Sequence, residues 1–256
     1  MPEFVKRNPS APPGFFACEA AGLNWLGNAP GGAPCAAVVR FDDTSLTLER
    51  LHTGAAAAEA AHEFGRRLAR THEAGATAFG AGPPGWDGPG FFGPLQSPMP
   101  MTLTAHDSWG RFYAEQRLAP MLDRAAAHLG PAGRGAVGDV IARCGAGDFD
   151  DGDRPARLHG DLWSGNVMWT EDGAVLIDPA AHGGHRETDL AMLALFGCPH
   201  LDAVYDGYCV VHPLRTGWRE RIPLHQLYPL LAHVALFGAG YSHPTVLAAQ
   251  AAMNIS

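Results

Sequence analysis

The chain has 256 residues, of which 46% are hydrophobic and 17% charged, a composition typical of globular proteins. The net charge of −8 and the lack of a Lys/Arg cluster argue against nucleic acid as a partner. Neither a signal-peptide pattern nor an apolar run of about 18 residues is present, so we expect no membrane span. The five cysteines are scattered without a C-x-x-C pair, which is typical of reduced thiols in a cytoplasmic protein.

The first fifty residues predict a small unit of strands and one helix. Apolar residues recur at helical spacing over residues 15–26, downstream of a short apolar run around Val5. Two strand-like runs, residues 38–41 and 45–51, then flank an Asp-Asp turn. The expected order is therefore strand, helix and hairpin.

Beyond Gly54 the chain is predicted to be mainly helical up to about residue 150. Helices are expected over residues 55–74, over residues 106–129 with a kink or division at Pro120, and over residues 134–144. Residues 79–104 are rich in glycine and proline and lack periodicity, so we predict a long irregular loop, from which we infer no site residues. The acidic run 148–155 lacks the ligand ladder of a calcium loop and is expected to be a solvated loop.

The stretch 158–178 carries the pattern H-x-D-x-x-x-x-N, formed by His159, Asp161 and Asn166, and it closes on Asp178. Between Asn166 and Asp178, two short runs of β-forming residues flank an Asp-Gly pair, which predicts a β-hairpin. Because a hairpin brings its two ends together, we expect Asn166 and Asp178 to lie side by side.

These residue types suit phosphoryl transfer. The amide oxygen of Asn166 and the carboxylate of Asp178 are ligands that Mg²⁺ accepts, and Asp161 on the loop between them can take a proton from a substrate hydroxyl. One base and two metal ligands on a loop and hairpin is the arrangement of protein kinases. A purely structural His-Gly-Asp turn is the alternative, but it does not explain an Asn and a second Asp at the two ends of a hairpin.

After the hairpin the chain is expected to be helical over residues 187–196, 200–212, 218–237 and 244–254. His182 and His185 form an H-x-x-H pair, but without a third ligand this pair does not predict a metal site.

Four segments of the sequence resemble the fructosamine kinase (ketosamine 3-kinase) family: HGDLWSGN, IDPAAHGGHRETDLAM, LFG and PLRTGWRERIPLHQLYPLLAHVALFGAGY. Two short motifs near the start match the same family pattern, namely F-V-K and F-x-x-E-A-x-G-L-x-x-L. The resemblance therefore runs from about residue 4 to residue 241. It implies an α+β, two-lobed, protein-kinase-like fold. Residues 1–53 would form a truncated, β-rich nucleotide-binding lobe, and residues 54–256 a large, mainly helical catalytic lobe.

The resemblance also implies an ATP-dependent kinase that uses Mg²⁺. Lys6, fixed by Glu19, would hold the nucleotide's α- and β-phosphates, and the backbone around Glu49 and Leu51 would read the adenine edge. Asp189 would hydrogen-bond the backbone of the catalytic loop.

Asp161 would then act as the base, with Asn166 and Asp178 also binding the nucleotide through the metal. Trp163 and His159 would contact the substrate, because both lie within the catalytic loop. The implied substrates are small-molecule or protein-bound ketosamines, such as fructosamine and ribulosamine adducts, and the implied role is protein deglycation and repair. A monomer is slightly favoured.

The sequence departs from the family pattern at one place. The glycine-rich loop and the strands that should precede Lys6 are absent, which is expected either of a fragment or of a natural variant with an incomplete nucleotide lid. Two alternatives to a ketosamine kinase therefore stand. One is another small-molecule kinase, such as an aminoglycoside or choline phosphotransferase, and the other is a pseudokinase-type binding protein.

Overall fold

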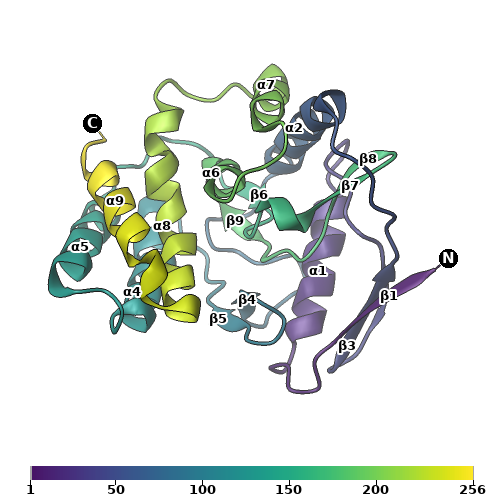
Figure 1. The fold of residues 1–256 in the computed structure, drawn as a ribbon, viewed down its shortest axis with the longest axis horizontal. Coiled ribbons are helices and arrows are strands. Elements are labelled where there is room, and N and C mark those ends of the chain that lie inside the picture. Colours follow the sequence, from purple (N-terminus) through teal and green to yellow (C-terminus); the bar gives the residue numbers. More distant parts are fainter. Residues whose placement is uncertain (1, 256) are drawn as a thin grey trace.

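The N-terminal part of the chain forms a three-stranded antiparallel sheet covered by one helix. In the computed structural model, which describes residues 2–255, the strands β1 (Glu3–Arg7), β3 (Ser45–Glu49) and β2 (Val38–Phe41) lie side by side in that order (Figure 1). Helix α1 (Phe15–Gly27) buries its apolar residues against β3, whose side chains facing the helix are buried. The predicted order of strand, helix and hairpin is confirmed.

Helices α2 (Ala58–Glu73) and α7 (Leu201–Val211) pack against each other on the large lobe (Figure 1). Their backbones approach closely because a glycine lies at each contact. A Cβ atom added at Gly65 would collide with the carbonyl group of Val204, and one added at Gly207 would collide with that of His62. Helix α2 begins three residues later than expected, because the N–H of Gly54 donates to the carbonyl of Trp169 at 2.7 Å and holds the entering chain extended.

The helices farthest from the N-terminal sheet are α4 (Ala119–Ala125), α5 (Pro131–Ala146), α8 (Trp218–Phe237) and α9 (Ser242–Met253) (Figure 1). They share one large apolar core. The helix expected over residues 106–129 is divided, as Pro120 predicts. It consists of α3 (Trp109–Phe112), a π-helical segment (Tyr113–Leu118) and α4, whose first turn contains the proline, where its missing N–H is tolerated.

The structure corrects the expectation of an irregular loop over residues 79–104. Strands β4 (Gly90–Phe92) and β5 (Met99–Met101) form a short antiparallel hairpin, and all their residues except Pro100 are buried. Strands of three residues with a proline on the exposed side carry too little alternation to be recognised in a sequence.

The acidic run 148–155 is an irregular loop with exposed residues, as expected, but two of its carboxylates are paired and not solvated. The Asp151 carboxylate lies 3.3 Å from Nε2 of His185, and the Asp153 carboxylate accepts a 2.7 Å hydrogen bond from Nε of Arg186. These partners come from a segment some thirty residues later, so the sequence pattern alone does not reveal them.

The middle of the large lobe holds two short strand pairs. Strand β6 (Ala156–Leu158) pairs with β9 (His182–Gly184), and between them in the chain β7 (Val167–Thr170) pairs with β8 (Gly173–Leu176). Helix α6 (Glu187–Leu195) follows β9. Within residues 2–255 no helix is both long and apolar enough to cross a lipid bilayer.

Candidate active site

The predicted hairpin places Asn166 and Asp178 next to each other. Strands β7 and β8 pair from Val167 with Leu176 onward, and the N–H of Ile177 donates to the carbonyl of Asn166 at 3.1 Å. The side-chain nitrogen of Asn166 lies 3.4 Å from the carbonyl oxygen of Asp178. The expected juxtaposition at the open end of the hairpin is therefore present.

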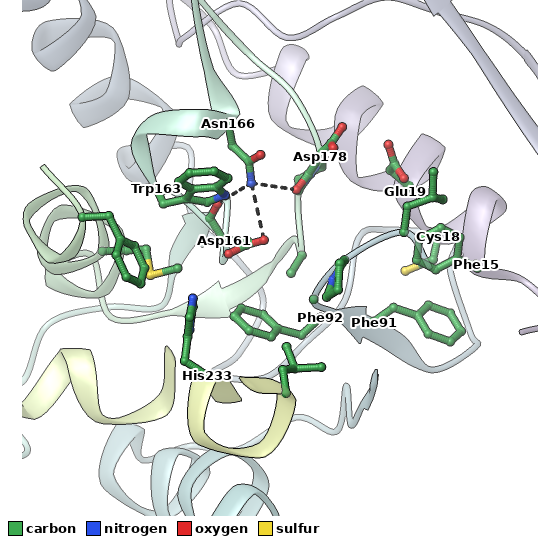
Figure 2. Close-up of a pocket in the computed structure, with 18 of the residues that line it drawn as sticks. Phe15, Cys18, Glu19, Phe91, Phe92, Asp161, Trp163, Asn166, Asp178 and His233 are labelled. Atoms are coloured by element: carbon green, nitrogen blue, oxygen red, sulfur yellow. Dashed lines mark hydrogen bonds between the residues drawn. The ribbon is translucent and has the colours of Figure 1, made fainter. Parts of the chain in front are cut away.

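Asn166 also fixes the loop that carries Asp161. Its Nδ2 donates to the carbonyl of Asp161 at 2.8 Å and lies 3.4 Å from Oδ2 of the same residue (Figure 2). The amide nitrogen is thus committed to the loop, and the amide oxygen is the atom left for a cation.

Asp189 holds the other side of the same loop. Its carboxylate accepts the backbone N–H of His159 at 2.8 Å and that of Gly160 at 2.9 Å, and it lies 3.1 Å from Nε2 of His72. Burial alone would raise the pKa of Asp189, but the His72 imidazole and the loop N–H groups outweigh burial and lower it. A buried, ionised carboxylate therefore keeps the loop in one conformation.

Gly160 makes that conformation possible. Its φ of +81° lies in the left-handed region, and an added Cβ atom would collide with the carbonyl group of Ala180. The glycine in H-G-D is therefore required by the backbone.

Lys6 joins the sheet to the hairpin. It is the one buried residue in the pattern of β1, and its Nζ donates to both carboxylate oxygens of Glu19 at 2.7 and 2.9 Å. The same Nζ lies 3.0 Å from Oδ1 of Asp178. Burial raises the pKa of Glu19 to about 6, helped by the Asp178 carboxylate and opposed by Lys6.

Asp161 carries a perturbed carboxyl group. Burial, followed by the repulsion of the Asp178 carboxylate, raises the pKa of Asp161 to about 7, although the amide of Asn166 acts in the opposite direction. Such a carboxylate can accept a proton near neutral pH, and perturbed groups of this kind cluster at functional sites.

The backbone of Asp178 is strained. Its φ of +54° is in the left-handed region, which a non-glycine residue adopts at a cost of about 1 kcal/mol or more. In this conformation the carboxylate, two residues after β8, lies beside Nζ of Lys6.

These groups open onto one cavity of about 470 Å³. Figure 2 shows Glu19 and Asp178 on one side of it, Trp163 and His233 on the other, and Asp161 between them. The lining also includes residues that the sequence analysis did not single out, namely Phe91, Phe92, Leu95, Phe196, Leu236, Phe237 and Tyr241. Phe91 and Phe92 come from the unpredicted hairpin, and the only signal for them was the apolar Gly-Phe-Phe run.

Three expected site residues do not line the cavity. His159 is only 1% exposed, with its Nε2 donating to the carbonyl of Ile177 at 2.8 Å and its Nδ1 accepting the N–H of Asp161 at 3.2 Å. It supports the loop from beneath, which corrects the expectation of a substrate contact. Glu49 pairs with the backbone of Ala37, and Leu51 packs near α1, so their proposed contact with adenine stays a prediction.

A buried Lys–Glu pair, a loop bearing Asp161 and Asn166, and a hairpin that ends in Asp178 define the protein-kinase-like class of folds. The family model for fructosamine kinases matches residues 2–254, and the chain belongs to this family.

Individual relatives agree with this assignment. A crystal structure described as a candidate fructosamine-3-kinase from Thermobifida fusca has 50% identity and a TM-score of 0.91, covering 99% of this chain and 86% of that one. A probable ketoamine kinase of Synechocystis sp. is 36% identical over 77% of this chain, and the match spans 63% of that relative's length. The chloroplastic protein-ribulosamine 3-kinase of Arabidopsis thaliana is 32% identical over 93% of this chain and 72% of its own length.

Proposed function

We propose that this protein transfers the γ-phosphoryl group of ATP to the sugar 3-hydroxyl of a ketosamine. The observation that carries the proposal is the position of Asp161. It lies in the cavity between a charged end, with Lys6, Glu19 and Asp178, and an end that contains Trp163 (Figure 2). A base between a phosphate-binding group and an apolar surface is the arrangement that a sugar kinase needs.

The charged end fits a nucleotide and its metal ion. Lys6 is a buried cation whose partners, Glu19 and Asp178, fix its Nζ, so it can bind phosphate oxygens without losing side-chain freedom. The carboxylate of Asp178 and the amide oxygen of Asn166 are hard oxygen ligands that suit Mg²⁺. When bound, Mg²⁺ would neutralise charge on the phosphate oxygens.

Asp161 would act on the acceptor. Its carboxylate would accept the proton of the sugar hydroxyl and orient that oxygen for in-line attack on the phosphoryl group. In the metal-free protein the pKa of Asp161 is raised to about 7, so its carboxylate is a better base than that of an ordinary aspartate.

The substrate class follows from family membership. Fructosamine and ribulosamine adducts, free or on protein lysines, carry the required 3-hydroxyl next to a carbonyl carbon. A phosphate at that position is a good leaving group, so the product would decompose, and the reaction would serve deglycation and repair of proteins. We place this activity in the cytoplasm, in keeping with the five free thiols of the chain.

A turnover assay tests the proposal. ADP formation is measured with MgATP and a panel of acceptors: a ribulosamine, a fructosamine, choline and an aminoglycoside. We expect turnover on at least one ketosamine and loss of it in Asp161→Asn. Turnover restricted to choline or the aminoglycoside would refute the proposed substrate class, and no turnover on any acceptor would refute the assignment as a kinase.

A further inference from the structure

Five ring-bearing residues gather at the end of the cavity opposite Lys6. We call this group the aromatic cage: Trp163, Phe196, His233, Phe237 and Tyr241. The ring centroids form a connected set, because Phe196 lies 6.4 Å from Trp163 and 4.8 Å from His233, while His233 lies 5.4 Å from Phe237 and 4.9 Å from Tyr241. The rings come from the catalytic loop, the residue after α6, the last turns of α8 and the segment that follows α8.

Three of the cage rings are largely exposed and are not used as core. Trp163 is 40% exposed, Phe196 38% and Phe237 60%, although large aromatic side chains contribute most to stability when buried. Three exposed rings that converge on one cavity are typical of a binding site and not of packing.

His233 adds one directed polar atom to the cage. Its Nδ1 lies 2.7 Å from the carbonyl oxygen of Pro229, and because a carbonyl can only accept, Nδ1 carries the proton. Nε2 therefore bears a lone pair, and Figure 2 shows the ring directed from α8 toward Trp163 and Asp161. Burial lowers the pKa of His233, which keeps the ring neutral and its acceptor available.

Carboxylates are absent from this end of the cavity. Among the described residues that line the cavity, the acidic ones are Glu19, Asp161 and Asp178. Asp161 lies on the catalytic loop, and the other two lie at the end that contains Lys6. A polycationic acceptor such as an aminoglycoside would be expected to require several carboxylates. Aromatic faces with a single neutral acceptor suit one positive charge that carries N–H groups.

We propose that the aromatic cage binds the secondary ammonium group of the ketosamine, with its N–H donating to Nε2 of His233. This inference rests on the proposed function, because it places the 3-hydroxyl at Asp161. The amine is attached to C1, so four bonds separate its nitrogen from the 3-oxygen, a span of about 5 Å at full extension. The N–H of Trp163 donates to the carbonyl of Asp161 at 3.1 Å, which keeps the base and the first cage ring within one turn of chain.

The exposed rings leave room for the part of the substrate beyond the amine to extend out of the cavity. With Phe196 and Phe237 at the rim, the substituent on the amine can extend into solvent, so a lysine side chain on a protein surface can be accommodated. The cage thus recognises the positive charge of the amine and accepts different substituents on its nitrogen.

A matched pair of acceptors tests the charge. The first is 1-deoxy-1-propylamino-ribulose and the second is the 1-O-propyl ether of ribulose, which has the same shape without the ammonium. We expect the kcat/KM of the amine to exceed that of the ether by roughly tenfold, the size of a cation–π contact at partly exposed rings plus one hydrogen bond. Equal values for the two acceptors would overturn the cage proposal and leave the kinase function standing, whereas phosphorylation of neither would overturn both.

Variants locate the effect. Phe237→Leu removes an exposed π face and should reduce the amine-to-ether ratio at least threefold. Phe41→Leu, which changes another exposed ring on β2 outside the cavity, should not change the ratio. His233→Phe keeps a ring but loses the acceptor and should also lower the ratio, and His233→Gln should restore part of it. An unchanged ratio in both Phe237→Leu and His233→Phe would overturn the proposal.

Discussion

Nζ of Lys6 lies 3.0 Å from Oδ1 of Asp178, so strand β1 and the end of the β7–β8 hairpin are joined by a direct ion pair. Glu19 shares the same ammonium group, and the Lys6 and Glu19 side chains are 8% and 6% exposed. Two carboxylates around one buried cation give this end of the cavity a net negative charge before any ligand binds. A divalent cation would relieve that imbalance, which is why nucleotide and metal are expected to bind together.

The Lys6–Glu19 pair should behave as an energetic unit. We expect Lys6→Met to destabilise the fold by about 3 kcal/mol, because it leaves the buried Glu19 carboxylate without its partner, and Glu19→Gln to cost less, because Asp178 still pairs with Lys6. The loss of unfolding free energy in the double variant should be smaller than the sum of the two single losses, by about 1–3 kcal/mol. Urea unfolding of the four proteins measures this coupling, and strictly additive losses would show that the pair is not coupled.

Asp161→Asn should lower kcat by roughly 10²–10⁴-fold, the loss typical of a removed general base, while leaving MgATP binding nearly intact. Comparison of kcat with the nucleotide dissociation constant separates the two effects. Asp172→Asn, which changes an exposed carboxylate in the turn of the same hairpin, is the matched control and should have normal kcat.

Asp161→Asn should also stabilise the metal-free protein in a pH-dependent way. The folded-state pKa of Asp161, about 7, lies above its ordinary value, so the parent gains stability from protonation at low pH and loses it as the pH rises through 7. Asp161→Asn lacks this loss. The free energy of unfolding of the variant should therefore exceed that of the parent by more at pH 8 than at pH 5. The difference should be about 1 kcal/mol after allowance for partial solvent exposure. Thermal unfolding in EDTA at both pH values measures it, and a larger advantage at pH 5 would contradict the raised pKa.

Asp178→Ala should weaken Mg²⁺-dependent nucleotide binding more than Asn166→Ala. A carboxylate contributes a full charge to the cation, whereas an amide contributes only a dipole. Titration of Mg²⁺ against nucleotide affinity ranks the two variants, and the reverse order would count against the proposed metal ligands.

The backbone strain at Asp178 predicts a further difference. Because glycine adopts a φ of +54° freely, Asp178→Gly should be more stable than Asp178→Ala by about 0.5–1 kcal/mol, although both lose the carboxylate. At Asp172, which has no such φ, alanine should be at least as stable as glycine. If alanine also exceeds glycine at position 178, the left-handed conformation does not persist in solution.

The hairpin half of the charged end could be predicted because its geometry is local, whereas the Lys6–Glu19 pair followed only from the family resemblance. Asn166 and Asp178 are the two ends of one hairpin, and Asp-Gly between β-forming runs specifies that hairpin. The Asp189 contact with the loop also appears as the family resemblance implies.

The aromatic half could not be predicted from spacing. His233 and Phe237 lie on α8, where a helical pattern shows that rings share a face but not whether that face meets a core or a cavity. Phe91 and Phe92 belong to a hairpin too short to recognise, and the H-x-D motif does not determine where the ring of His159 points. Each of these depends on contacts between distant segments.

The most direct test of the proposed chemistry is the position of the phosphate in the product. The full chain is incubated with MgATP and a ribulosamine whose C3 carries ¹³C, and a phosphorus–carbon correlation spectrum is recorded before the product decomposes. We predict a ³¹P signal coupled to C3 that is absent with Asp161→Asn. A sugar phosphate whose ³¹P signal is not coupled to C3, or ATP hydrolysis without a phosphorylated sugar, would contradict the proposed ketosamine 3-kinase activity.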